Sequence, residues 1–202
     1  MFLKIVRKER LPMEMWDIYD KNKKLTGRTM KKNDWCLKDD EYHLTVLGIV
    51  KHTDGRYLIT KRVMTKAWAP GWWEVSGGAC QAGETSLEAV RREVNEETGL
   101  NVSDKGEFLF DYHRENPGEG DNYFVDVYLF EMDFTEDDIN IQTEEAAGYK
   151  LATHDEILAL AKEGINIRMI DQGSSELNII IGVKNDDFEV AIKAIYNTFI
   201  GE

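Results

Sequence analysis

The stretch GACQAGETSLEAVRREVNEETGL, residues 78–100, decides the fold of this 202-residue chain. Thr85 is a favourable N-cap, and Glu88, three residues later, completes a capping box. Gly99 stands where a left-handed residue commonly ends a helix. The stretch therefore predicts a loop that leads into a helix of roughly 13 residues, or about 20 Å.

Three carboxylates lie close together in the second half of this helix. Glu93, Glu96 and Glu97 occupy positions i, i+3 and i+4, which spread over roughly 100° of the helix circumference. Like charges spaced in this way destabilise an isolated helix. They indicate either a solvated acidic face or a cation site, and carboxylate oxygens are ligands that Mg²⁺ prefers.

The residues around these acids follow a defined spacing. Gly78 is followed after five residues by Glu84, and after seven more by the run REVNEETGL, residues 92–100. This pattern resembles the Nudix box of the Nudix hydrolase family at each defining position. The resemblance implies an α/β/α sandwich with a mixed sheet, and a hydrolase that cleaves a diphosphate linkage with Mg²⁺ or Mn²⁺ by attack of activated water on phosphorus.

The same resemblance assigns roles to the acids. Glu93, Glu96 and Glu97 would ligate the metal, or one of them would act as the base. Some family members recruit an acid from a later loop, for which Glu144 and Glu145 are the candidates here. A solvated acidic loop is the alternative interpretation of these last two residues.

The resemblance also assigns supporting residues. Glu84 would hold the loop before the helix, and Arg92 would reach Glu96, four residues on, and orient its carboxylate. Gly77 would donate its carbonyl oxygen to the metal, and Gly78 would let the backbone approach the site closely.

Substrate contacts are less strongly indicated. Lys61 and Arg62 could reach a phosphate, or could simply be the exposed end of a strand. Several aromatic side chains could stack on a nucleobase or pack in the core: Trp68, Trp72, Trp73, Tyr112 and Tyr123. We favour a nucleoside diphosphate derivative over a prenyl diphosphate.

A second resemblance provides the main alternative. The segments 16–20, 43–44, 58–62 and 66–71 are similar to type I isopentenyl-diphosphate isomerases. Those enzymes need a catalytic cysteine and a histidine ligand, and Gly77 and Ala79 stand at these two positions, with Cys80 displaced. We therefore expect a hydrolase on this branch, with His43 as a structural strand residue. A non-catalytic pyrophosphate-binding module is the third alternative.

Other segments show the periodicity of strands and helices. A hairpin is expected over 15–30, with further strands at 43–50, 56–62, 107–112 and 123–133. A capped helix is expected from Thr153 to Lys162. Strands at 165–170 and 177–183 and a helix over 187–199 complete the chain.

The carboxyl-terminal segment resembles the last part of the ACT domain of aspartate kinases. We expect an N-terminal hairpin extension over 1–40, a Nudix domain over 41–163 and this partial ACT-like segment over 164–202. A partial domain exposes unpaired strand edges, so a homodimer through this segment is a hypothesis. A monomeric mass in light scattering would reject it.

Composition excludes some partners. The formal net charge is −13, so binding to a nucleic acid polymer is not expected. No apolar run approaches the roughly 18 residues that span a membrane, and the amino end lacks a signal-peptide pattern. We expect a cytoplasmic protein without membrane association, whose thiols Cys36 and Cys80 are reduced.

Overall fold

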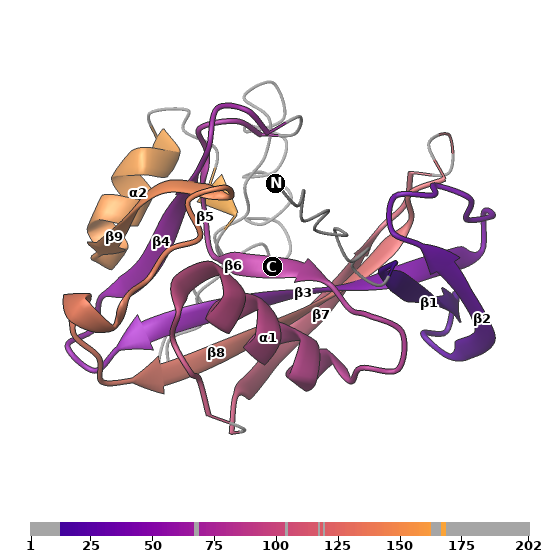
Figure 1. Cartoon of the computed structure of the whole chain (residues 1–202), viewed down its shortest axis with the longest axis horizontal. Coiled ribbons are helices and arrows are strands. Elements are labelled where there is room, and N and C mark those ends of the chain that lie inside the picture. Colours follow the sequence, from indigo (N-terminus) through magenta and orange to yellow (C-terminus); the bar gives the residue numbers. More distant parts are fainter. Residues whose placement is uncertain are drawn as a thin grey trace, which may run out of the picture.

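A computed structural model describes residues 13–66, 69–103, 105–116, 118, 120–162 and 167–168. Within these residues, ten strands form one mixed sheet (Figure 1). The strands are β1 (Met15–Asp20), β2 (Leu25–Lys31), β3 (Glu41–His52), β4 (Tyr57–Arg62), β5 (Trp73–Glu74), β6 (Ser76–Ala79), β7 (Glu107–Arg114), β8 (Tyr123–Met132), β9 (Ala146–Ala152) and β10 (Ile167–Arg168). The helices are α1 (Ser86–Thr98), α2 (His154–Lys162) and the short 3₁₀ helix η2 (Glu136–Asp138).

The middle of the sheet is a long parallel pair. β3 runs beside β8 from His43 to His52, and its other neighbours β1, β4 and β6 are antiparallel. The order along the main path is β10-β5-β4-β3-β1-β2. β7 extends the sheet beyond β8, and β9 pairs with β4.

Both faces of the sheet are covered, as the alternation along β3 shows. Val46 and Val50 belong to the same core cluster as Val90 and Val94 of α1. Ile49 belongs to a second cluster, which contains Ile157 of α2. Successive strand residues point to opposite faces, so the predicted arrangement of a mixed sheet between helices is confirmed.

Helix α1 has the predicted ends. The Thr85 side chain accepts a hydrogen bond from the Glu88 backbone N–H, and the Glu88 carboxylate accepts one from the Thr85 N–H. Gly99 has a φ of 78° and donates its N–H to the Asn95 carbonyl at 2.8 Å. These local contacts fix the position at which each acidic residue leaves the helix.

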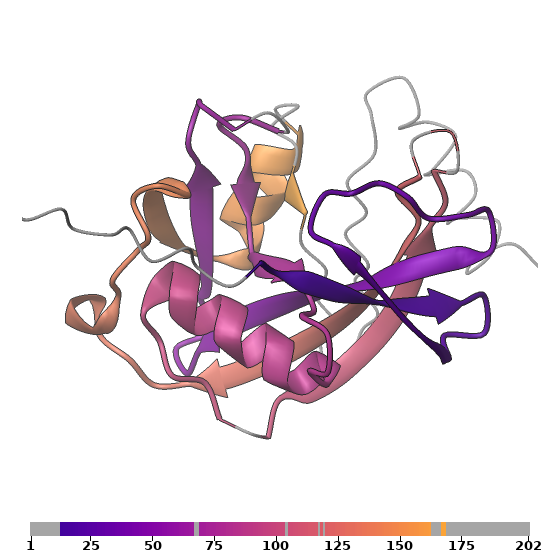
Figure 2. The same ribbon diagram turned by 45° about the vertical axis from the view of Figure 1, so that its right-hand side comes forward.

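The expected hairpin is present as β1 and β2. In Figures 1 and 2 it lies at the end of the sheet away from α2. Trp16, Ile18, Met30 and Leu37 form a small buried cluster of their own. The hairpin therefore carries its own core to the edge of the sheet.

Three strands were not predicted from the sequence. β5 has only two residues, and β6 is short and rich in glycine. β9 begins directly after the acidic residues Glu144 and Glu145, where no strand was expected. Of the expected segment 164–202, only Ile167 and Arg168 are described, and they form β10 inside the strand expected at 165–170. The strand expected at 177–183 and the helix expected over 187–199 lie outside the described residues. No helix in the described part of the chain has the length and apolar character needed to cross a membrane.

Candidate active site

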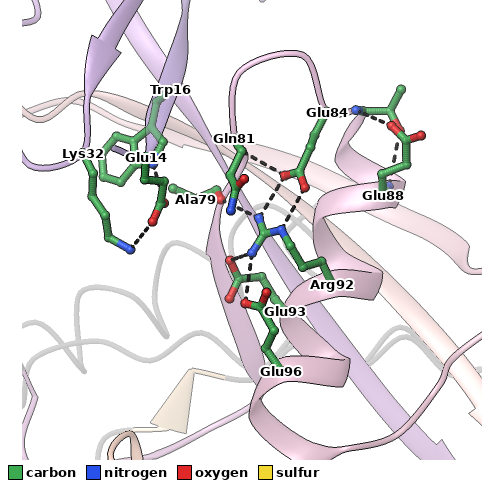
Figure 3. Close-up of polar contacts among 11 residues, drawn as sticks. Glu14, Trp16, Lys32, Ala79, Gln81, Glu84, Glu88, Arg92, Glu93 and Glu96 are labelled. Carbon is green, nitrogen blue, oxygen red and sulfur yellow. Dashed lines mark hydrogen bonds and ion pairs between the residues drawn. The ribbon is translucent and has the colours of Figure 1, made fainter. Parts of the chain in front are cut away.

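Arg92, in the middle of α1, is the centre of a polar network that joins the helix to the loop before it (Figure 3). Its Nε and Nη2 donate to the two oxygens of Glu84 at 2.8 and 2.9 Å. Nη2 also donates to the Ala79 carbonyl at 3.2 Å, and the Gln81 N–H donates to Glu84 at 2.9 Å. The guanidinium thus ties the loop before the helix to the helix itself, the position expected for Glu84.

Arg92 also binds two of the acids that follow it. Its Nη1 donates to Glu93 at 2.6 Å and to Glu96 at 3.3 Å, so the expected contact with Glu96 is present. The three acids of the helix do not converge on a single point, because Arg92 draws the first two toward itself. Within the described residues, no group of three His, Cys, Asp or Glu side chains is gathered closely enough to hold a metal ion.

Glu97 lies on the side of α1 that faces β6. Its carboxylate accepts a hydrogen bond from the Gly77 N–H at 3.3 Å. Burial, and next the charge of Glu93, raise the pKa of Glu97 well above its ordinary value. Burial also raises the pKa of Glu93, although Arg92 opposes the shift. Two partly buried carboxylates side by side form an environment that favours a bound cation.

The two glycines before the loop allow this close packing. A Cβ on Gly78 would lie 2.5 Å from the carboxyl carbon of Glu93, and one on Gly77 would lie 2.5 Å from the Val46 carbonyl oxygen. β6 therefore approaches both α1 and β3 as only glycine permits. Carboxylate oxygens next to the glycine backbone of β6 are the kind of ligand that a hard divalent cation prefers.

These residues open into a cavity of about 570 Å³. The cavity is lined by the hairpin and the segment after it, and by β3, β6 and α1. The loop after β4, the end of β7 with the loop that follows it, the start of β8 and the turn before β9 complete the lining. The described residues that line it are Glu14, Trp16, Lys32, Asn33, Trp35, His43, Thr45, Lys66, Gly77, Gly78, Ala79, Gln81, Arg92, Glu93, Glu96, Glu97, Arg114, Asp121, Tyr123, Gln142 and Glu145.

The cavity includes some of the predicted substrate residues and one of the two candidate acids of the later loop. Tyr123 and Glu145 line it, and Glu145 forms an ion pair with Lys66. Glu144 is exposed and is not among the described lining residues. Tyr112 lies on β7 and is also outside that set.

Other predicted residues lie elsewhere. Lys61, Arg62 and Trp72 are not among the described residues that line the cavity, and Trp68 lies outside the described part of the chain. Arg62 donates to both oxygens of Glu74 at 3.0 Å. The Lys61 ammonium lies 5.7 Å from the centre of the Trp73 ring. Both cations are held by β5, whose pairing with β4 was not predicted.

The lining also contains residues that the sequence reading missed. Lys32, Lys66 and Arg114 bring positive charge, and Trp16 and Trp35 bring aromatic rings. A tryptophan at position 35, between polar neighbours and outside any alternating pattern, is an unusual feature that could have drawn attention. Nothing in the local sequence relates the three cations to the acidic helix.

The residues relevant to the isomerase alternative are buried. Cys80 belongs to the core cluster under α1, and burial raises the pKa of its thiol. His43 is buried on β3, stacks on Trp16 at 4.7 Å between ring centres and has its Nε2 3.3 Å from Asp121. The thiol is therefore a core group.

Comparison with known proteins decides the family. The NUDIX domain model matches residues 41–172. An uncharacterized Nudix hydrolase of Listeria monocytogenes is 35% identical over 154 residues, which cover 75% of this chain and 87% of that relative. The chain belongs to the Nudix hydrolase family. This Nudix hydrolase is accordingly an enzyme that hydrolyses its substrate, as the sequence predicted.

Other comparisons are more limited. The crystal structure of DR0079 from Deinococcus radiodurans has a TM-score of 0.60 and 23% identity, over 77% of this chain and 93% of that chain, and it supports the fold. A nucleoside triphosphatase, NudI of Enterobacter, is 40% identical over 55 residues, or 27% of this chain and 39% of that protein.

An ACT domain model matches residues 157–199, consistent with the resemblance of the tail. These comparisons do not support the hypothesis of an isopentenyl-diphosphate isomerase-like protein. The expected domain boundaries at residues 40 and 163 stay a prediction.

Proposed function

We propose that this Nudix hydrolase uses Mg²⁺ or Mn²⁺ to cleave the diphosphate linkage of a nucleoside diphosphate derivative. One observation carries the proposal. Glu93, Glu96 and Glu97 line a cavity that is also lined by cationic and aromatic side chains. An acidic helix that was merely solvated would not face such a cavity. Members of the family generally use divalent metal ions, which agrees with this donor set.

Glu97 and Glu93 are the residues best placed to hold the cation, with Glu96 at the exposed rim. A divalent cation supplies Lewis-acid chemistry, since it polarises phosphoryl oxygens and makes water nucleophilic near neutral pH. Arg92 donates hydrogen bonds to Glu93 and Glu96 and so fixes their positions. To bind a cation, these carboxylates must turn partly away from Arg92. The Gly77 carbonyl remains a candidate ligand.

The rest of the cavity suits a nucleotide. Lys32, Lys66 and Arg114 can neutralise phosphate charge, which an overall acidic protein needs locally. Tyr123, beside Arg114, offers a ring and a hydroxyl, and Arg114 donates to that hydroxyl at 3.3 Å. The name of the NudI relative, a nucleoside triphosphatase, agrees with a nucleotide substrate.

The test is the release of phosphate, pyrophosphate or a nucleoside monophosphate from a panel of nucleoside triphosphates, nucleotide sugars, dinucleotide polyphosphates and prenyl diphosphates, with and without Mg²⁺ or Mn²⁺. We expect metal-dependent release from a nucleotide, reduced by orders of magnitude in Glu97→Gln. Glu107→Gln is the matched control, because Glu107 is an exposed carboxylate on β7 outside the described lining of the cavity.

Three results would overturn the proposal. Full activity in Glu97→Gln would show that the metal site has been misplaced. A silent panel combined with isomerisation of isopentenyl diphosphate would instead establish the alternative reaction. Nucleotide binding without turnover in the wild-type enzyme would leave a pyrophosphate-binding module.

A further inference from the structure

The segment before the NUDIX match is attached firmly to the site. β1 pairs with β3 at Tyr19 and Asp20. The Ala82 N–H donates to the Met15 carbonyl at 2.8 Å, and the Gly83 N–H donates to the Asp17 carboxylate at 2.7 Å. The hairpin therefore binds the same loop that leads into the acidic helix α1.

The connection from the hairpin to β3 is also fixed. The Asn122 side chain is fully buried and donates to the carbonyls of Lys38, Asp39 and Glu41 at 3.2, 3.3 and 3.2 Å. Its side-chain oxygen accepts the Asn116 N–H at 2.7 Å. A buried amide with these partners holds the connecting segment at one place on the sheet.

Trp35 stands in this connecting segment and faces the cavity. It is 45% exposed, an unusual state for a large aromatic side chain. Its backbone has a φ of 48°, and a Cβ on Gly120 would lie 2.2 Å from its carbonyl oxygen, so the loop is seated closely on Gly120. The ring is therefore exposed while its backbone is closely held.

A series of ring contacts links Trp35 to the middle of the site. Its ring packs edge-to-face on Trp16 at 6.3 Å, and Trp16 stacks on His43 of β3 at 4.7 Å. Lys32, three residues before Trp35, pairs with Glu14 at 2.7 Å. Figure 3 shows this pair on the hairpin side, facing the network of Arg92. The segment that follows β2 thus brings a partly exposed aromatic ring and a cationic side chain to one cavity.

From this arrangement we infer that residues 13–40 form the recognition wall of the substrate pocket, in which the Trp35 ring stacks on the nucleobase. Lys32 lies on the same wall at a place suited to the phosphate groups. A fixed ring face suits any planar base, because stacking requires no particular hydrogen-bond pattern. This inference rests on the proposed function and names the part of the substrate that the hairpin recognises.

The test measures binding separately from turnover. Isothermal titration calorimetry with Mg²⁺ would compare adenosine 5′-(α,β-methylene)diphosphate with methylenediphosphonate, which lacks the nucleoside. We expect Trp35→Ala to lower the affinity for the nucleotide analogue by roughly 5-fold to 100-fold, the effect of losing one stacked base. The affinity for methylenediphosphonate should be unchanged. Trp35→Phe keeps a ring and should restore most of the affinity.

Phe108→Ala is the matched control, since Phe108 is an exposed aromatic residue on β7 away from the described lining. Unchanged affinity of Trp35→Ala for the nucleotide analogue would overturn the inference. Equal weakening of both ligands would assign Trp35 a structural role and overturn it as well. If wild type hydrolyses only base-free or prenyl diphosphates in the panel, the proposed function fails first, and Trp35 has no base to bind.

Discussion

Replacement of Gly78 by alanine tests whether the carboxylate of Glu93 must stand where the structure places it. The added Cβ would lie 2.5 Å from the carboxyl carbon of Glu93, whereas non-bonded carbons prefer about 3.5–4.0 Å. The carboxylate must therefore move by about 1 Å. A displacement of this size can cost roughly 100-fold in rate.

We expect kcat/KM for Mg²⁺-dependent hydrolysis of the diphosphate linkage to fall by about 100-fold in Gly78→Ala. The melting temperature should change little, because the displaced atoms are the end of a flexible side chain. Gly148→Ala is the control: its added Cβ would meet nothing within 4 Å, and its φ is ordinary. Wild-type kcat/KM in a folded Gly78→Ala variant would refute the argument that Glu93 is held close to the backbone for catalysis.

Three further predictions concern stability. Because the pKa of Glu97 is raised in the folded state from 4.5, the contribution of this group to the stability of the metal-free protein should fall as pH rises above that value; with chelator at neutral pH, Glu97→Gln should melt above wild type, and a lower melting temperature would contradict this. Gly48→Ala would place a Cβ 2.6 Å from Val94 and 2.9 Å from Val90, so urea denaturation should show a loss of about 1–3 kcal/mol. Asn122→Ala removes a fully buried amide that donates to three backbone carbonyls and accepts the Asn116 N–H, and it should cost about 2 kcal/mol in the same assay; unchanged stability in either variant would argue against the packing described.

Local signals in the sequence were sufficient to predict α1 and the positions of its acidic residues. The capping box at Thr85 and the left-handed Gly99 act within a few residues, so the helix was predicted with its correct ends. The contact from Arg92 to Glu96 follows from helix geometry in the same way. The longer strands of the sheet were expected because their apolar runs are bounded by turn residues, such as Thr53, Asp54 and Gly55 between β3 and β4.

Features that depend on distant partners were not predictable in this way. β6, with the sequence SGGA, has no strand pattern and becomes a strand because residues 76–79 pair with residues 45–48 of β3. Arg62 was a candidate either for a phosphate contact or for the exposed end of a strand, but β5 brings Glu74 beside it. The place of Trp35 in the cavity depends on the seating of its loop on Gly120, a contact between residues far apart in the chain.

The central claim is that carboxylates of α1 support attack of water on phosphorus, and ³¹P NMR of the products formed in ¹⁸O-labelled water tests it most directly. With Mg²⁺ and the nucleotide that the panel identifies, we predict an isotope-shifted phosphate resonance for wild type and for Glu107→Gln, and no such product for Glu97→Gln over the same time. Products that carry no label in phosphate, or a labelled product formed equally well by Glu97→Gln, would contradict the account.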